Sequence, residues 1–142
     1  MNDINTYKQS GELYLWEYTE NISNYPGFHM SWASDGKSSF TDFLVLLRQA
    51  QPGTYRTLTL SKPNELILGV PNNKHQKIIT KPKLRIELSG DEKSGIEVRN
   101  DYIYLKILCS EIDEMLNKLP DVMPQNELSI RVNKTDSISF WW

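Results

Sequence analysis

Cys109 is the residue of this sequence best placed for nucleophilic chemistry. It directly precedes Ser110, which we expect to cap the start of a helix, and a helix N-terminus favours the reactive thiolate form of a cysteine. A cysteine nucleophile also needs a general base, and the two histidines are His29 and His75. Nothing in the sequence places either of them near Cys109. We therefore expect Cys109 to be a small apolar core residue, because free cysteine is among the most buried residue types.

The spacing of possible metal ligands gives no support for a metal site. The sequence holds two isolated histidines and one cysteine, and it contains neither a Cys-x-x-Cys nor a His-Glu-x-x-His motif. We expect no metal and no cofactor. His29 and His75 are expected to be ordinary surface or boundary residues.

Residues 31–38, Ser-Trp-Ala-Ser-Asp-Gly-Lys-Ser, follow a predicted strand and precede a predicted helix. The segment resembles the phosphate-binding loop of P-loop nucleotide hydrolases, which has a glycine, four residues and then Gly-Lys-Ser/Thr. Ser31 stands where the first glycine should be, and Trp32 and Asp35 would crowd the backbone N–H groups that must reach phosphate. We expect a glycine turn in which Ser38 or Ser39 caps the helix. Weak anion binding at this helix start is the alternative.

Aromatic residues offer the strongest indication of a binding surface. The chain has four Trp, seven Tyr and four Phe, and Trp141 and Trp142 point to opposite faces if they continue a strand. Exposed Trp and Tyr side chains are typical anchors of protein interfaces. The candidate partner-binding residues are Tyr14, Trp16, Trp32, Tyr102, Tyr104 and Trp141. An alternative is a pocket for a planar or sugar-like ligand, lined by Tyr14, Trp16, Trp32 and Tyr55.

Composition excludes several functional classes. The net charge of −2 makes nucleic-acid binding by bulk electrostatics unlikely. The segment 74–85, which includes Lys83 and Arg85, is basic but lacks stacking aromatics, so we interpret it as a solvated loop and a lysine-protected edge strand. Binding of a phosphate backbone or of an acidic partner is the alternative for this segment. A single cysteine cannot form an intramolecular disulfide, which favours a reducing compartment. No secretory signal and no membrane-length apolar stretch is visible, so a cytoplasmic location without membrane contact is expected.

The elements that must position these residues are strands and two helices. Apolar residues alternate in segments such as 12–18, 28–33, 84–88 and 102–107, which is typical of strands. Two helical stripes interrupt them: Phe40, Phe43, Leu44 and Leu47, and then Ile112, Met115, Leu116 and Leu119. Because hairpin-length connections predominate, we predict an α+β two-layer sandwich, with a mainly antiparallel sheet and two helices packed on one face. Residues 1–142 form a single domain, and polar residues 1–10 are expected to be flexible.

These observations favour a small soluble protein that is not an enzyme and binds another protein. In general outline it is similar to bacterial immunity proteins, which neutralise a toxin by binding it. The alternative function is small-ligand binding or a minor enzymatic activity in the aromatic-lined pocket, where Cys109 and His29 would be the first residues to mutate. The sequence does not specify the oligomeric state.

Overall fold

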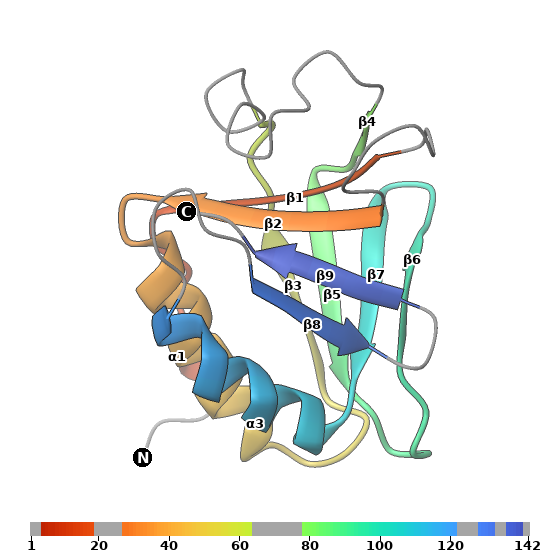
Figure 1. Cartoon of the computed structure of the whole chain (residues 1–142). Coiled ribbons are helices and arrows are strands. Elements are labelled where there is room, and N and C mark those ends of the chain that lie inside the picture. Colours follow the sequence, from red (N-terminus) through yellow and green to blue (C-terminus); the bar gives the residue numbers. More distant parts are fainter. Residues whose placement is uncertain (1–3, 19–26, 64–77, 122–127, 133–135, 141–142) are drawn as a thin grey trace.

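The computed structural model describes residues 4–18, 27–63, 78–121, 128–132 and 136–140, and Figure 1 shows their arrangement. The helices are η1 (Ile4–Thr6), α1 (Gly36–Arg48), α3 (Cys109–Lys118) and η2 (Leu119–Asp121). The strands are β1 (Glu12–Tyr18), β2 (Gly27–Ala33), β3 (Tyr55–Thr59), β4 (Ile78–Thr80), β5 (Lys83–Leu88), β6 (Gly95–Val98), β7 (Tyr102–Ile107), β8 (Leu128–Val132) and β9 (Asp136–Phe140).

The described strands form two sheets. Sheet A has the strand order β4-β1-β2-β9-β8, and sheet B has the order β3-β5-β7-β6. Most neighbouring strands are antiparallel, whereas β2 pairs with β9 and β5 pairs with β7 in parallel. Helices α1 and α3 lie next to each other along one side of the sheets (Figure 1). The predicted α+β sandwich with mostly antiparallel strands and two helices is therefore confirmed. The division of the strands between two sheets was not visible in the sequence pattern.

One hydrophobic core joins the inner faces of both sheets to the helices. Strand β1 contributes Leu13 and Leu15, and strand β2 contributes Phe28, Met30 and Trp32. Sheet B and the helices supply the other large side chains of this core, among them Phe40, Phe43, Leu44, Leu47, Leu84, Ile86, Leu88, Ile103, Leu105, Ile107, Ile112 and Met115. Both helical stripes thus face the core, as their spacing predicts.

The starts of both helices differ from the serine caps expected from the sequence. Helix α1 begins at Gly36 after Asp35, and α3 begins at Cys109 after Leu108. In α3 the Glu111 carboxylate accepts a hydrogen bond from the Leu108 N–H at 2.8 Å. A carboxylate three residues into a helix satisfies a backbone donor that would otherwise lack a partner, so Ser110 is not needed as a cap.

Gly36 lies where two backbone segments meet. A Cβ atom at this position would lie 2.0 Å from the carbonyl oxygen of Glu12. A Cβ at Gly11, which has a φ of +68°, would lie 2.1 Å from the Gly36 nitrogen. Both glycines therefore permit the start of β1 to pack against the start of α1, and this close approach explains the glycine of Gly36-Lys37-Ser38 without a phosphate.

The N-terminal residues that we expected to be flexible make specific contacts from residue 4 onward. Ile4 and Tyr7 are buried against the core. The Gln9 side-chain amide donates to the Thr59 carbonyl at 2.7 Å and accepts from the Thr59 N–H at 2.8 Å. Strand β3 is at the edge of sheet B, so the Gln9 side chain supplies the hydrogen bonds to Thr59 that a further strand would otherwise make.

Candidate functional site

The structure separates Cys109 from His29. Cys109 is partly buried and packs against the main core. His29 is fully buried on the other side of β2, where its ring stacks on Trp16 at a centroid distance of 5.8 Å and meets the edge of Tyr18 at 4.8 Å. The interpretation of His29 as a surface or boundary residue was therefore wrong. Because a β-sheet lies between the two side chains, they do not form a nucleophile–base pair. His75 lies outside the described residues.

The aromatic residues of β1 are not a free surface. Tyr14, Trp16 and Tyr18 share the face of sheet A that points away from the main core, and they form a second buried cluster with exposed fractions of 5%, 0% and 4%. The Tyr14 hydroxyl donates to the Glu12 carboxylate, and burial followed by this contact raises the pKa of Tyr14 to about 12. This cluster is structural in character because its rings are enclosed.

The four residues of the expected aromatic pocket are not brought together. Trp32 packs in the main core, on the opposite side of sheet A from Tyr14 and Trp16. Tyr55 belongs to sheet B and is 52% exposed. Trp141 lies outside the described residues. Of the predicted site residues, Tyr102 and Tyr104 are the two that lie partly exposed on a common face.

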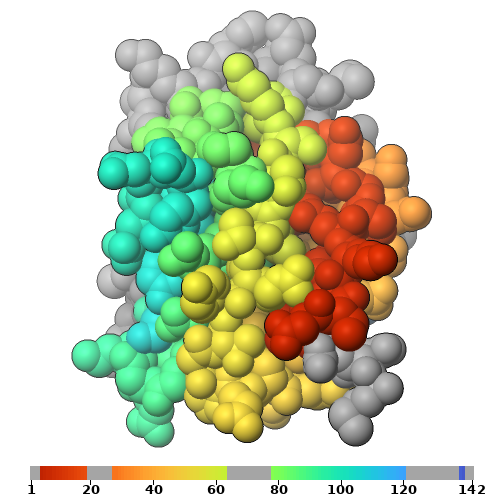
Figure 2. Space-filling model, turned by 180° about the vertical axis from the view of Figure 1, so that it is seen from behind, coloured from red at the N-terminus to blue at the C-terminus, as the bar shows by residue number. Residues whose placement is uncertain are grey.

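Tyr102 and Tyr104 belong to the outer face of sheet B, which we call the open face. Leu84, Ile86 and Leu88 of β5 point into the core, so the alternate residues of β5 point outward. Figure 2 shows β3, β5, β7 and β6 running side by side across this side of the molecule, with none of the described helices over them. The strand register places the following side chains on the open face: Tyr55, Thr57, Thr59, Lys83, Arg85, Glu87, Glu97, Tyr102, Tyr104 and Lys106.

Arginine and tyrosine side chains stack on one another across the open face. The Arg85 guanidinium lies 4.8 Å from the centre of the Tyr55 ring and 4.7 Å from the centre of the Tyr102 ring. Arg99, just after β6, lies 4.9 Å from the centre of the Tyr104 ring. These distances are within the range of cation–π contacts. They hold the aromatic rings and the guanidinium groups in fixed orientations on a solvent-facing sheet.

Ion pairs and hydrogen bonds neutralise several charges around this stack. Arg99 binds the Glu97 carboxylate. The Lys106 ammonium lies 2.8 Å from the Asp91 carboxylate and lowers the pKa of Asp91 to about 2. The pKa of Tyr104 is raised, first by burial and then by the charge and hydrogen bond of Glu87.

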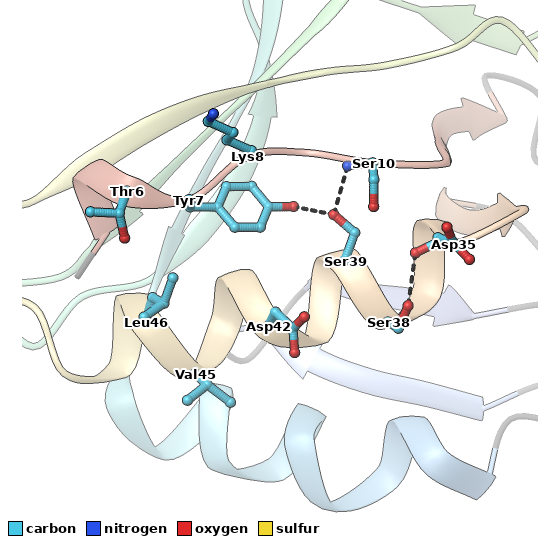
Figure 3. A pocket seen from close by; sticks show the side chains of 10 residues that line it. All are labelled: Thr6, Tyr7, Lys8, Ser10, Asp35, Ser38, Ser39, Asp42, Val45 and Leu46. Carbon is cyan, nitrogen blue, oxygen red and sulfur yellow. Dashed lines mark hydrogen bonds between the residues drawn. The ribbon is translucent and has the colours of Figure 1, made fainter. Parts of the chain in front are cut away.

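A groove lies between residues 6–10 and helix α1, apart from the open face. This groove has a volume of about 570 Å³, and Figure 3 shows its lining. The Tyr7 hydroxyl lies 2.6 Å from the Ser39 Oγ, and the Ser10 N–H donates to the same oxygen at 3.0 Å. Burial is the main reason why the pKa of Tyr7 is raised. Since the Ser39 hydroxyl is held by Tyr7 and Ser10, the groove has the chemistry of a polar binding cleft rather than that of a serine nucleophile.

Sequence reasoning missed Arg99 as a site residue. It noticed Arg85 as part of a basic segment but interpreted this segment as a solvated loop and an edge strand, which was wrong for β5 because this strand lies between β3 and β7. The alternation of Lys83, Arg85 and Glu87 with buried leucine and isoleucine does indicate an outward face on β5. The tyrosine rings that contact Arg85 and Arg99 belong to other strands, and a local sequence pattern does not identify such neighbours.

Within the described ranges, no group of three or more His, Cys, Asp or Glu side chains is arranged to hold a metal ion. None of the described helices combines the length and apolar character needed to cross a membrane. Comparison of the chain with protein-family models, curated proteins and solved structures finds no match.

Proposed function

We propose that this protein is a protein-interaction module that binds its partner through the open face of sheet B. The observation that carries the proposal is the stack of Arg85 between Tyr55 and Tyr102 on a sheet face that α1 and α3, the two described α-helices, leave uncovered. Tyrosine and arginine are enriched among the residues that dominate binding energy at protein interfaces. Because these rings are already oriented by stacking, binding costs less side-chain entropy than it would with freely rotating side chains.

The test is affinity purification of the tagged chain from the cells that express it natively, with the variants Tyr55→Ala and Tyr104→Ala. Val45→Ala is the matched control, because Val45 is an exposed apolar residue (39%) on helix α1, away from sheet B, and it lines the groove beside residues 6–10 instead. We expect a stoichiometric protein partner with the wild type and with Val45→Ala, and at least tenfold less of it with the two tyrosine variants. A partner that is retained by both tyrosine variants and lost with Val45→Ala would overturn this assignment. So would a monomer that co-purifies with a small molecule.

Neutralisation of a bacterial toxin is a narrower form of the same proposal. Its support is the general similarity in size and net negative charge between this chain and bacterial immunity proteins. Inspection of the neighbouring gene is the simplest test, since an immunity-type role requires an adjacent or co-inherited toxin. Co-expression should then restore growth, and Tyr55→Ala should weaken the protection. A neighbourhood without any toxin gene would count against this form and leave general protein binding in place.

We also propose a cytoplasmic location. It is supported by the single cysteine, which cannot form an intramolecular disulfide and is typical of a reducing compartment. Subcellular fractionation with an antibody to the native protein tests it, and recovery of the chain outside the cell would contradict it.

Small-ligand binding is a second candidate function, and it is favoured by the groove beside helix α1. Its volume of about 570 Å³ falls in the range of small-molecule sites, roughly 300–1,000 Å³. Most of the lining side chains are polar, with Ser10, Ser39 and Asp42 among them, and Tyr7 is the aromatic residue of the lining. Native mass spectrometry of the purified protein should detect a bound compound if this groove is the functional site.

A further inference from the structure

We propose that Arg85, which is stacked between Tyr55 and Tyr102, binds a carboxylate of the partner protein. The open face then recognises an aspartate or glutamate side chain of that partner. This inference rests on the proposed function and adds the chemistry of the partner.

The first argument is the state of the charges on the open face. Arg99 is paired with Glu97, Lys106 is paired with Asp91, and Glu87 interacts with the Tyr104 hydroxyl. Arg85 has neither an ion pair nor a hydrogen bond with any residue in the described part of the chain, and its Nε atom is buried without a hydrogen-bond partner. Lys83 and Arg85 are thus the cations of the open face that no described carboxylate pairs with, and Arg85 is the one stacked between two tyrosine rings.

The second argument is geometric. Tyrosine rings contact the guanidinium of Arg85 at 4.8 and 4.7 Å, which leaves its planar edge with the N–H donors as the part that can bind a further group. A carboxylate matches this edge because its two oxygens can accept parallel N–H bonds. The flanking rings also restrict water, and a charged hydrogen bond is stronger where water is excluded. Arg85 is therefore oriented for a bidentate contact before the partner arrives.

Charge distribution favours an acidic protein over nucleic acid. Glu87 and Glu97 lie on the same face as Arg85, and the register places them opposite Tyr55, Lys106 and Tyr104. A phosphate backbone is bound by a row of uncompensated cations, whereas on β5 Glu87 follows Lys83 and Arg85, and the nearby Arg99 is already paired with Glu97. A partner with a single acidic side chain among apolar neighbours fits this pattern better.

The probe for this inference is a phage-displayed library of random twelve-residue peptides. Peptides are selected on the wild-type chain in the presence of an excess of the soluble Arg85→Met variant, which keeps the aliphatic stem of the side chain. One selected peptide is then synthesised in its acidic form and with Asp→Asn or Glu→Gln at the enriched position. Fluorescence anisotropy measures Kd for the wild type, Arg85→Met, Arg85→Lys and the control Arg48→Met. Arg48 is an exposed arginine on helix α1 that pairs with Asp113.

We expect an aspartate or glutamate to be enriched at one position of the selected peptides. The acidic peptide should bind Arg85→Met at least tenfold more weakly than the wild type, with Arg48→Met unchanged. Arg85→Lys should be intermediate, because lysine keeps the charge and loses the planar fork. The amide form of the peptide should bind the wild type and Arg85→Met with the same Kd. This result would show that the affinity lost in Arg85→Met comes from the contact between Arg85 and the peptide carboxylate. Circular dichroism and melting curves establish that each variant is folded, and if Arg85→Met is not, Arg85→Lys provides the comparison.

Selected peptides without an acidic position, or an amide peptide that binds the wild type as well as the acidic one does, would overturn the inference. If such peptides still lose affinity with Tyr55→Ala, the open face remains a binding surface and only the carboxylate chemistry fails. Peptides that are indifferent to both Tyr55→Ala and Arg85→Met would refute the proposed function as well. A labelled twenty-nucleotide single strand that binds more tightly than the peptides at physiological salt, and does so through Arg85, would replace the acidic protein with nucleic acid.

Discussion

Replacement of Gly36 by alanine tests whether the Gly-Lys-Ser segment is a packing feature or a phosphate site. Alanine is normally the better helix residue, by about 1 kcal/mol in a helix interior. At this position, however, the added Cβ would lie 2.0 Å from the Glu12 carbonyl oxygen, 2.9 Å from the Glu12 carbonyl carbon and 3.0 Å from the Trp32 Cβ. The start of β1 and the start of α1 would therefore have to separate.

The size of the effect follows from what must move. The nearest atom is backbone, so a displacement of about 1 Å or more cannot be absorbed by a side-chain rotation. Overpacking of this kind costs about 1–3 kcal/mol of folding free energy. We expect a cost near the upper end of this range because two backbone segments, the starts of β1 and α1, must move apart. After subtraction of the gain in helix propensity, we expect a loss of about 2 kcal/mol. For a domain of this size the melting temperature should fall by about 4–8 °C.

The assay is urea unfolding followed by circular dichroism, with thermal melts as a second measurement. Gly90→Ala is the control, since its Cβ would meet the nearest atom, the Pro52 Cβ, at 3.3 Å. That variant should stay within about 0.5 kcal/mol of the wild type. A Gly36→Ala protein with wild-type stability would refute the packing argument. A rise in the wild-type melting temperature on addition of phosphate, absent in Gly36→Ala, would support an anion site instead.

Three further predictions concern stability and ionisation. Met115→Asp should unfold the domain, because Met115 is fully buried and an unpaired charge in its place costs several kcal/mol; a normal melting curve would show that the stripe of α3 is misassigned. Gln9→Ala should accelerate hydrogen exchange of the Thr59 amide and cost about 1 kcal/mol, since the amide loses its acceptor; unchanged exchange would mean that the edge of β3 is protected in another way. Lys106→Met should return the pKa of Asp91 from about 2 towards its ordinary 3.8, as measured by NMR of the carboxyl carbon. Because the folded pKa of Asp91 lies below the unfolded value, its stabilisation is present above about pH 4 and lost as the pH falls towards 2. Equal acid sensitivity of the wild type and Lys106→Met would contradict this pairing.

Local periodicity was sufficient to predict which face of an element is buried. Leu13 and Leu15 face the main core while Tyr14, Trp16 and Tyr18 face the other way, as a two-residue repeat requires. The helical stripes were equally readable because residues at i, i+3 and i+4 share a face whatever the helix packs against. These features depend on neighbours along the chain, and the sequence contains them directly.

Strand partners and helix caps were less predictable. The serine caps were wrong because backbone packing at Gly36 and the carboxylate of Glu111 determine where the helices begin. His29 was misread because a histidine opposite an apolar face looks solvent-exposed. The aromatic residues on the second face of β1 could have indicated that His29 is buried, because His29 lies opposite Trp16 in the pairing of β1 with β2.

Only part of the candidate site could be read in advance. Tyr102 and Tyr104 were identified because they alternate with the apolar residues of β7. Their contacts with Arg85 and Arg99 depend on register between strands, and parallel pairing of β5 with β7 cannot be inferred from hairpin-length connections. A non-local register is decided by the packing of the complete core rather than by either strand alone.

Parallel pairing of β2 with β9 also bears on how the protein is made. It joins residues 28–30 to residues 138–140, whereas the strand pairs within sheet B all lie between residues 55 and 107. At a translation rate of about 5–20 residues per second, β2 is synthesised on the order of ten seconds before β9. During this interval the edge of β2 that pairs with β9 in the folded protein has no β9 strand to pair with. Any chaperone that assists this chain during synthesis should bind in that interval, at Phe28 and Met30.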